Sequence, residues 1–431
     1  MDAVPERADL VVVGGGVCGA VCAAEAARRG AHVVLLEKEA DLAQEASGRS
    51  FGSLRLQGRH PAELPLAMDA LELWTEAART LGTDFEFVPG GNLYVAETAV
   101  EVEQLREQLE RAKAAGFTDV RLLSPPETRE LIPSLTRGFA AALYSPRDAH
   151  CDPRKAVLAY ASAARRRGAQ LVLGTKATEI AVAGGAVTAV GTDRGAVRTE
   201  RAVIAAGVWT PRLVRDLGIR IPIKPIVYTN GETGPLPPLS TATLRAFRFS
   251  CRQRPSGELL IGAGLNATVA HPVSLEDLDD LRLWLPRYWA NRRQIELRLD
   301  AARLWRELRG VGRPAAAGIP VGAHPAASAR VLRPALHALQ AWLPPARDAT
   351  ITRTWAGLLD LSPDGLPVIE RTRRPDGLVL VTGLSGHGFG LAPVLGRILA
   401  DLALDGRTGY DLTAFRLDRF EASVPMPARL V

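Results

Sequence analysis

Three glycines and a glutamate near the start of the chain have the residue types and spacing of a nucleotide site. Gly14, Gly16 and Gly19 follow the apolar run 10–13, and Glu37 ends the next apolar run. Such glycines permit a tight turn, let backbone N–H groups approach a pyrophosphate, and let the following helix pack closely with its positive end toward the phosphates. A glutamate at this distance accepts hydrogen bonds from a ribose diol and would repel a 2′-phosphate. The pattern predicts a dinucleotide other than NADP.

A second glycine-rich helix start lies near the other end of the chain. The apolar run 378–381 leads into the segment 382–390, which contains four glycines, and a helix is expected over 391–404. A ligand that contacts both glycine turns must be long. FAD meets this requirement better than NAD does.

The elements that position these turns come from separate stretches of the chain. A helix and a strand are expected within 152–180, and another strand-to-helix junction at 202–211. We therefore predict an α/β fold, with a Rossmann-like FAD-binding domain of the glutathione-reductase type and a second, α+β substrate domain on a mixed or antiparallel sheet. The expected boundaries are 1–84, 146–225 and 348–415 for the FAD-binding domain, 85–145 and 226–347 for the substrate domain, and 416–431 for a C-terminal tail.

The substrate domain is expected to contain a helical insert at about 275–317. Within it, 275–309 is interpreted as a helical pair interrupted at Pro286, rich in tryptophan and arginine. Elsewhere the stretch 247–262 predicts two strands joined by a turn at 255–257. We expect the insert to cover the substrate entrance or to pack on a partner subunit, with additional core on the substrate domain as the alternative of equal weight.

Composition and charge narrow the class of protein. The 431 residues are 47% hydrophobic and 23% charged, which is typical of a soluble multidomain protein. The net charge of +6 comes from 48 arginines and five lysines dispersed among 47 acids, so we expect no nucleic-acid partner. The four cysteines form no CxxC pair, and we expect no metal site, no secretory signal, no membrane span and a cytoplasmic location.

Seven motifs in order make the chain resemble the FAD-dependent D-amino-acid oxidase family, which includes glycine oxidase, sarcosine oxidase and several amino-acid dehydrogenases. The resemblance covers nearly the whole chain outside about 275–317, and the segment 385–389 with the tail from Asp411 to Phe420 looks most like the sarcosine oxidase beta-type branch. The motifs are 14–37, 46–52, 152–180, 205–209, 228–257, 355–367 and 383–392.

The resemblance implies a set of FAD contacts. Those with the ADP half would come from Gly14, Gly16, Gly19, Glu37 and Lys38, with Ala177 at the adenine and Gly207 and Trp209 at the pyrophosphate. Those with the flavin would come from Ser47, Arg49, Ser50, Gly357, Gly383, Gly386, His387, Gly388 and Phe389. A helix start with backbone donors at the flavin can stabilise the negative charge that it gains on reduction.

The family's reaction moves a hydride from the carbon that bears an amine to flavin N5, and the resulting imine hydrolyses. Catalysis of this kind is mostly positioning and electrostatics. A substrate carboxylate is best held by an arginine, because its planar fork binds both oxygens. The candidates are Arg49, Arg55, Arg252 and Arg254, with Tyr228 as a second donor and His387 as a residue that orients the substrate or contacts the flavin.

Three departures from the family pattern qualify these implications. Gly357 stands where monomeric sarcosine oxidase has the cysteine that tethers its flavin, so FAD is expected to bind without a covalent bond. No lysine follows Lys224, whereas that enzyme uses a later lysine to activate oxygen, so the electron acceptor is either O2 or a partner subunit. Pro153 stands where the heterotetrameric enzyme attaches FMN through a histidine, and only a non-covalent FMN at a subunit interface remains as an expectation.

The leading hypothesis is oxidation of the C–N bond of a small amino acid or secondary amine such as sarcosine, glycine, a D-amino acid, hydroxyproline or an opine. One alternative is a 2-hydroxy-acid dehydrogenase of a sister branch. Another is a flavoprotein subunit that mainly scaffolds a complex or relays electrons. An oligomer is expected, with a hetero-oligomer as one form.

Overall fold

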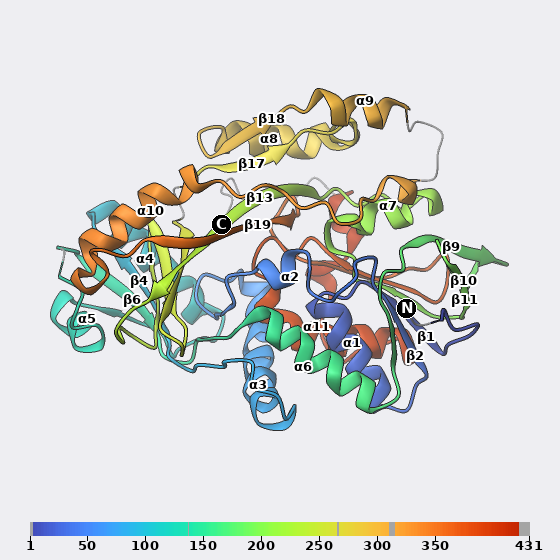
Figure 1. The fold of residues 1–431 in the computed structure, drawn as a ribbon, viewed down its shortest axis with the longest axis horizontal. Coiled ribbons are helices and arrows are strands. Elements are labelled where there is room, and N and C mark those ends of the chain that lie inside the picture. The colour runs from blue at the N-terminus through green and yellow to red at the C-terminus, as the bar shows by residue number, and fades with distance from the viewer. Residues whose placement is uncertain (1–2, 137, 265–266, 310–314, 422–431) are drawn as a thin grey trace.

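The computed structural model describes residues 3–136, 138–264, 267–309 and 315–421. Figure 1 shows two large sheets next to each other along the long axis of the molecule. The first is a six-stranded sheet that contains both apolar runs of the first glycine motif. In spatial order its strands are β20 (Val368–Arg371), β21 (Leu378–Thr382), β12 (Ala202–Ile204), β1 (Leu10–Val13), β2 (Val33–Leu36) and β8 (Gln170–Val172).

All neighbouring strands of this sheet are parallel except β20, which is antiparallel to β21. The central strands are apolar throughout and fully buried, as expected for a sheet covered on both faces. The chain leaves β1 between β12 and β2, where strand order reverses, and a ligand site is expected at such a point. The Rossmann-like fold is therefore confirmed.

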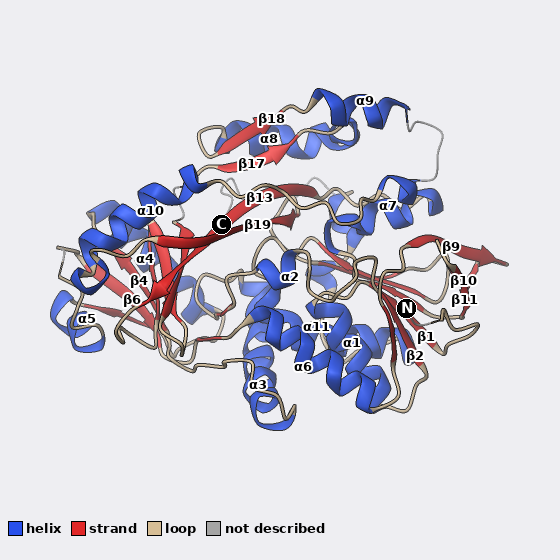
Figure 2. Cartoon of the chain, in the orientation of Figure 1, coloured by secondary structure: helices blue, strands red, loops and turns tan. Residues whose placement is uncertain are grey.

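Three helices pack together on one face of this sheet (Figure 2). α1 (Val17–Arg28) lies between α6 (Pro153–Arg166) and α11 (Gly388–Leu404). The approach of α1 and α11 is so close that a Cβ atom on Gly396 would lie 2.3 Å from Val21 Cγ1. The glycine turns that begin α1 and α11 are consequently brought to the same edge of the sheet, as the need for one long ligand predicted.

Residues 177–198 form a separate three-stranded antiparallel sheet. Its strands are β9 (Ala177–Ala183), β10 (Ala186–Thr192) and β11 (Gly195–Arg198). Short helical elements complete the FAD-binding half: α2 (Ala46–Arg49), α3 (Leu64–Thr80) and α7 (Thr210–Val214), with β3 (Ser53–Leu54) and β7 (Ala149–His150) forming a two-stranded pair.

The second large sheet is mixed, as predicted. Its strands in spatial order are β18 (Ile295–Arg298), β17 (Val269–Pro272), β13 (Lys224–Pro235), β16 (Glu258–Ala263), β15 (Phe249–Gln253), β14 (Thr243–Ala246), β4 (Asn92–Ala96), β6 (Ala141–Ser145) and β5 (Arg121–Leu123), with β19 (Ile351–Leu361) paired to β13. Helices α4 (Ala99–Ala114), α5 (Pro125–Leu131) and α10 (Ala329–Trp342) accompany it. Leu332, Leu339 and Trp342 of α10 pack on the apolar face, which leaves the other face toward the FAD-binding half.

The expected domain boundary at residue 348 needs correction. β19 runs antiparallel to β13 from Thr233 down to Lys224, so residues 351–361 belong to the substrate sheet. Sequence reasoning placed them in the FAD-binding domain because they precede the glycine motif of α11. The long β13–β19 ribbon instead joins the two halves of the molecule (Figure 1).

The insert differs from the expected helical pair. It comprises a 3-10 turn (Leu275–Asp280), α8 (Leu281–Asn291), the strand β18 and α9 (Ala301–Arg309), while residues 310–314 lie outside the described part. α8 continues through Pro286, because the carbonyl of Arg282 that loses its hydrogen bond lies on the exposed side of the helix. β18 extends the large sheet by pairing with β17, a non-local contact that helical periodicity could not reveal.

One side of the insert is buried and the other is apolar and exposed. Trp284 packs with Ile226 and Leu361 and is 1% exposed. The exposed large side chains of the insert are Leu278, Leu281, Leu285, Trp289, Leu297, Leu299, Trp305 and Leu308. The insert therefore adds a small core and also presents an apolar face. In the described part of the chain, no helix has both the length and the apolar character required to cross a bilayer.

Candidate active site

The first glycine turn forms one wall of an elongated cavity. Gly14 has a φ of +114°, and a Cβ atom there would lie 2.4 Å from the carbonyl oxygen of Ala205. A Cβ atom on Gly16 would lie 3.0 Å from Ser47 Oγ, which accepts a hydrogen bond from the Val17 N–H at 3.0 Å. Side chains at these positions would fill the space beside the start of α1, where a pyrophosphate is expected to lie.

Most of the residues expected to contact the ADP half do line this cavity. They are Gly14, Gly16, Glu37, Lys38, Ala177, Gly207 and Trp209, and Ser47, which was expected at the flavin, lines it too. Gly19 does not line it, but a Cβ atom at Gly19 would lie 1.9 Å from the Gly14 carbonyl oxygen. Its lack of a side chain lets α1 pack against the turn, which is the packing role predicted for it.

Glu37 is buried and supports the turn as well as lining the cavity. Its Oε2 accepts a hydrogen bond from the Gly15 N–H at 2.6 Å, and its Oε1 accepts one from the Glu39 N–H at 2.9 Å. Burial raises its pKa, although these two hydrogen bonds oppose the shift. Lys38 next to it pairs with Glu39 and, at 2.7 Å, with Glu45. Sequence reasoning expected only the ribose contact and missed the support of the turn.

The far end of the cavity is reached by β19 and β21. Asp360 lies there with Leu358, Val381 and Leu384. The Thr382 hydroxyl donates to Asp360 Oδ2 at 3.3 Å and to the carbonyl oxygen of Gly207 at 2.9 Å. These contacts connect β19 and β21 to the junction that follows β12. Burial raises the pKa of Asp360 to about 6, with backbone N–H donors opposing the shift. Asp360 was not among the predicted site residues.

Gly357 lies opposite Tyr228 in the β13–β19 ribbon. A Cβ atom on Gly357 would lie 2.8 Å from the Tyr228 ring, so a larger residue would displace that ring. The Tyr228 hydroxyl donates to the Ala46 carbonyl oxygen at 3.3 Å, and burial raises its pKa. Tyr228 thus fixes α2 against the substrate sheet, and in this geometry its hydroxyl is directed at the backbone.

The second glycine turn contains three residues whose backbone is left-handed. Gly383, Ser385 and Gly386 have φ angles of +69°, +51° and +82°. The Ser385 hydroxyl donates to the Gly383 carbonyl oxygen at 3.0 Å and holds the turn. A Cβ atom on Gly388 would lie 2.4 Å from the Leu384 side chain. These glycines are required by the tight turn that starts α11.

The side chains of His387 and Phe389 do not line the cavity beside the first glycine turn. Phe389 is buried and stacks on Trp74 with ring centroids 5.3 Å apart. His387 Nδ1 lies 2.9 Å from Arg59 Nη1 and 3.2 Å from Glu63 Oε1. The rings of His387 and Phe389 thus belong to the packing between α11 and α3, and their contacts with flavin or substrate stay a prediction.

Arg59 and Glu63 form part of a buried cluster of charge with Arg55 and Arg245. Burial lowers the pKa of each of the three arginines. Arg245 lowers the pKa of Arg55 and of Arg59 further, while the Asp148 carboxylate opposes the shift in all three. Burial would raise the pKa of Glu63, but His387 and Arg59 lower it to about 2. The Arg59 Nε donates to the Arg55 carbonyl oxygen at 3.0 Å. We call Arg55, Arg59 and Arg245 the arginine cluster.

The arginine cluster adjoins the start of α11. A Cβ atom on Gly390 would lie 2.7 Å from Arg59 Nη2 and 3.7 Å from the Arg55 backbone nitrogen. Arg55 was one of the sequence candidates for holding a carboxylate. Arg245 was not, because nothing in its local sequence distinguishes it from the other arginines, and only the sheet pairing places it next to Tyr94.

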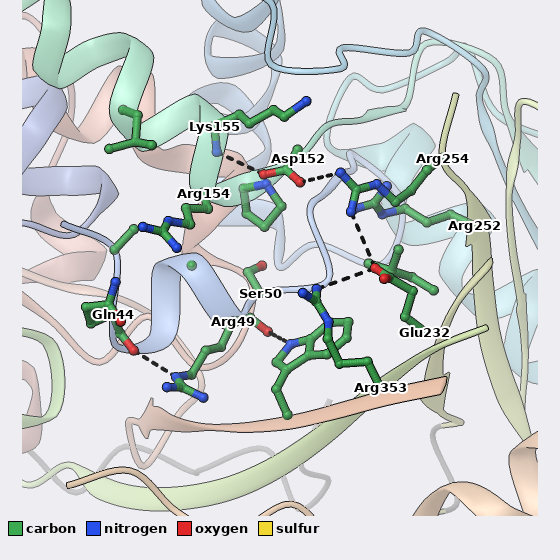
Figure 3. A pocket seen from close by; sticks show the side chains of 16 residues that line it. Gln44, Arg49, Ser50, Asp152, Arg154, Lys155, Glu232, Arg252, Arg254 and Arg353 are labelled. Carbon is green, nitrogen blue, oxygen red and sulfur yellow. Dashed lines mark hydrogen bonds and ion pairs between the residues drawn. The ribbon is translucent and has the colours of Figure 1, made fainter. Parts of the chain in front are cut away.

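The remaining arginine candidates surround a second cavity of about 520 Å³ on the other side of α2 (Figure 3). Arg49 donates to the Gln44 and Ala356 carbonyl oxygens at 2.7 and 3.1 Å. Arg252 donates to the carbonyl oxygens of Phe51 and Cys151 at 2.6 and 3.0 Å. Both guanidinium groups thus donate to backbone carbonyl oxygens, and these hydrogen bonds connect the two halves of the protein.

Arg254 also has partners of its own in this cavity. It forms ion pairs with Glu86, Asp152 and Glu232 at 2.8, 3.0 and 3.4 Å. Ser50 lies on the same wall, next to the start of α6. Arg49, Arg252 and Arg254 are therefore brought together, as a set of cationic residues that already have acceptors. They are weaker candidates for a carboxylate anchor than sequence reasoning suggested.

Comparison with known proteins identifies the family. Residues 9–402 match the family described as FAD dependent oxidoreductase, DAO. The chain belongs to the DAO family. The fold is also found in a solved structure: an L-amino acid deaminase from Proteus vulgaris superposes with a TM-score of 0.87 at 23% identity, covering 97% of this chain and 99% of that one.

Two curated relatives of this DAO family chain are informative. A glycine oxidase from Geobacillus kaustophilus (strain HTA426) is 26% identical over 426 residues, covering 96% of this chain and 97% of the relative. A 4-methylaminobutanoate oxidase (formaldehyde-forming) from Paenarthrobacter nicotinovorans is 24% identical over 424 residues, covering 97% of this chain and 46% of the relative. The chain spans between 26% and 46% of the length of the first three curated relatives that it matches.

Proposed function

We propose that this protein is an FAD-dependent oxidoreductase that oxidises the C–N bond of a small amino acid or secondary amine. The observation that carries the proposal is the junction of two features: a cavity lined by glycines for a dinucleotide, and the arginine cluster beside the helix start where that dinucleotide would end. The names of two relatives support it, since glycine oxidase and 4-methylaminobutanoate oxidase both refer to amino-acid substrates.

FAD, when bound, supplies a hydride acceptor at N5. The substrate carbon loses its hydrogen with two electrons, the nitrogen loses a proton, and a C=N bond forms that water then hydrolyses. The protein's part is to hold the substrate carbon next to the acceptor and to exclude other geometries. Arg55 is our candidate for the residue that binds the carboxylate, because it lies near the α11 start and, among the described residues, its guanidinium donates a single hydrogen bond, to the Gln57 carbonyl oxygen at 2.5 Å.

Several finer properties follow as part of the proposal. Non-covalent FAD is supported by Gly357, whose position next to the Tyr228 ring leaves no space for a tethering side chain. A dehydrogenase that passes electrons to a partner is supported by Lys224, the last lysine, which is buried and pairs with Asp277 at 2.8 Å. The cavity at the start of α6 would suit an FMN at an interface, because six basic side chains line it.

A cytoplasmic location and an oligomeric state complete the proposal. The four cysteines are free and buried, which suits a reducing compartment. The exposed leucines and tryptophans of the insert suit contact with a partner subunit.

The test is anaerobic reduction of the FAD-loaded protein by a panel of amines, amino acids and 2-hydroxy acids. Reduction is monitored as the loss of the yellow flavin absorbance. We expect at least one amino acid or secondary amine to bleach the flavin. Bleaching by 2-hydroxy acids alone would support the sister-branch dehydrogenase, and bleaching by none would support a scaffolding subunit. Acid precipitation should release the flavin into solution, where chromatography distinguishes FAD from FMN.

Admitting air after reduction separates the two acceptor classes. We expect slow reoxidation and fast reduction of an added artificial acceptor dye. Rapid reoxidation with release of hydrogen peroxide would contradict the argument from the missing lysine and would identify O2 as the acceptor.

A further inference from the structure

Asp360 is a buried carboxylate at the far end of the elongated cavity beside the first glycine turn, called the FAD cavity from here on. The residue is 5% exposed, and among the described residues no lysine, arginine or histidine forms an ion pair with it. Burying a carboxylate without a counter-charge is costly unless hydrogen bonds compensate for the lost water. What Asp360 does therefore depends on the donors that face it.

Strand alternation directs Asp360 into the FAD cavity and away from the charges of the insert. Successive side chains of a strand point to opposite faces, and Leu358 lines the cavity together with Asp360. Leu361 points to the other face, where it packs on the insert. Lys224 is paired with Leu361 across the β13–β19 ribbon and shares that face, where it forms an ion pair with Asp277 at 2.8 Å. The lysine of the neighbouring strand therefore does not neutralise Asp360.

The protein donors around Asp360 come from the start of the second glycine turn. The Thr382 hydroxyl donates to Oδ2 at 3.3 Å, which is longer than the roughly 2.7 Å typical of an O–H···O⁻ hydrogen bond. Burial raises the pKa of Asp360 to about 6, although the backbone N–H groups of Gly383 and Leu384 favour the ionised form. A carboxylate has about four lone-pair positions, so Asp360 can accept further and closer hydrogen bonds on the side that faces the cavity.

Asp360 also faces the start of α1. Cys18 lines the cavity at this helix start, and burial, with a smaller effect of the Asp360 carboxylate, raises the pKa of its thiol to about 12, so the thiol is neutral. Along the cavity, Glu37 and Ala177 mark the end expected to hold adenosine, and Gly16 marks the helix start expected to hold the pyrophosphate. The group of FAD that follows the pyrophosphate is the ribityl chain, so this chain is the part that would reach Asp360.

The chemistry of the ribityl chain fits this carboxylate, because its hydroxyl groups are donors, whereas a phosphate beside an acid without a counter-charge is repelled. We infer that Asp360 binds the ribityl hydroxyl groups of FAD through its two carboxylate oxygens. The contact corresponds, at the other end of the cavity, to the one expected between Glu37 and the ribose. Because the ribityl chain joins the pyrophosphate to the flavin ring, Asp360 is a cofactor-binding residue that fixes where the ring lies. The inference rests on the FAD dependence of the family and not on the proposed substrate.

Competition on the FAD-loaded protein tests the contact without any substrate. The protein is dialysed to equilibrium against mixtures of FAD with its 2′-, 3′- or 4′-deoxyribityl analogue, and chromatography of the bound flavin gives the ratio of the two affinities. We expect FAD to bind at least about 10-fold more tightly than one or more of the analogues, because a hydrogen bond to a charged group contributes this much. A smaller preference over every analogue would overturn the inference.

Variants then assign the preference to Asp360. Asp360→Leu has nearly the same shape without acceptors, so it should release FAD on dilution at least about 10-fold more readily and should bind FAD and the analogues within about threefold of each other. Asp360→Asn keeps one acceptor oxygen and should restore part of the preference. Asp364→Asn is the matched control, because Asp364 has a side chain that is 16% exposed, pairs with Arg419 at 2.7 Å and does not line the FAD cavity. A preference retained in Asp360→Leu, or an equal loss of FAD affinity in Asp364→Asn, would overturn the inference.

ADP distinguishes a contact with the ribityl chain from an effect on the pyrophosphate, because ADP has the phosphates and lacks the ribityl chain. Its affinity, measured by displacement of FAD, should change by less than about threefold in Asp360→Leu. A change as large as that of the FAD affinity, in either direction, would show that the carboxylate acts on the ADP half and would overturn the inference. If Asp360→Leu fails to fold, the competition in the unmodified protein still decides it. A protein that shows the expected preference but whose flavin no amine reduces would contradict the proposed function alone.

Discussion

Replacing Glu63 by glutamine should destabilise the protein substantially although the change is nearly isosteric. Glu63 is 2% exposed, lies between His387 and Arg59, and has a pKa of about 2 in place of its ordinary value of 4.5. Each unit of pKa shift corresponds to about 1.4 kcal/mol, so the ionised form contributes about 3 kcal/mol to the free energy of unfolding at pH 7. The variant also leaves Arg59 buried without a counter-charge, which typically costs about 3 to 5 kcal/mol.

The pH dependence of this effect has a definite sign. Because the pKa of Glu63 is lower in the folded state, its stabilisation is complete above about pH 4.5 and is lost as the pH falls toward 2. The difference between the unmodified protein and Glu63→Gln should therefore be constant from pH 6 to 8 and should shrink in acid.

Urea denaturation followed by circular dichroism and by flavin fluorescence measures this difference. Glu72→Gln is the control, since Glu72 is in α3, the helix that Glu63 precedes, has a side chain that is 73% exposed and pairs with Arg147 at 3.4 Å. We expect it to change the free energy of unfolding by less than about 0.5 kcal/mol. A Glu63→Gln protein as stable as this control at pH 7 would refute the argument that the arginine cluster needs Glu63.

Three further predictions concern the FAD cavity and the buried cysteines. Glu37→Gln should weaken FAD binding by about 10-fold or more in a fluorescence titration, because an amide cannot accept from both the Gly15 and Glu39 N–H groups; unchanged affinity would contradict the role of Glu37 in the turn. Asp360→Asn should stabilise the protein above pH 6 by about 3 kcal/mol in urea denaturation and have little effect below pH 4, since the raised pKa of about 6 means that ionisation opposes folding as the pH rises from 3.8; a destabilised variant at pH 8 would contradict this. The cysteines Cys18, Cys22, Cys151 and Cys251 should not react with an aromatic disulfide reagent at pH 8 until the protein is denatured, because burial raises the pKa of every thiol; rapid reaction of the folded protein would show that at least one is accessible.

The nucleotide half could be predicted from sequence because its signals are local. Gly14, Gly16 and Gly19 specify a turn whose shape depends on a few adjacent residues, and the apolar strands before and after it are continuous in the chain. Among the cavity contacts inferred by resemblance, Trp209 also lies at a strand-to-helix junction of this kind, between β12 and α7, whereas Ala177 begins the strand β9.

The substrate half was predicted less completely because its decisive contacts are between distant residues. Tyr94 and Arg245 are 151 positions apart and meet through the parallel pairing of β4 with β14, which has no local signature. For the same reason sequence reasoning placed Arg252 at the substrate, whereas its donors bind the carbonyl oxygens of Phe51 and Cys151. Among 48 arginines, only the fold shows which ones lack a partner.

The order of strands in the six-stranded sheet has a consequence for biosynthesis. β1 pairs with β12, which the ribosome makes almost 190 residues later, and β12 in turn waits for β21 near residue 380. The nascent chain therefore cannot complete the sheet, or close the far end of the FAD cavity at Val381 and Leu384, until the segment 378–384 has emerged. Parallel pairing over such separations is slow to form and exposes apolar strands meanwhile. Flavin supply and chaperone capacity during late synthesis should consequently limit the yield of folded protein more than the rate of translation does.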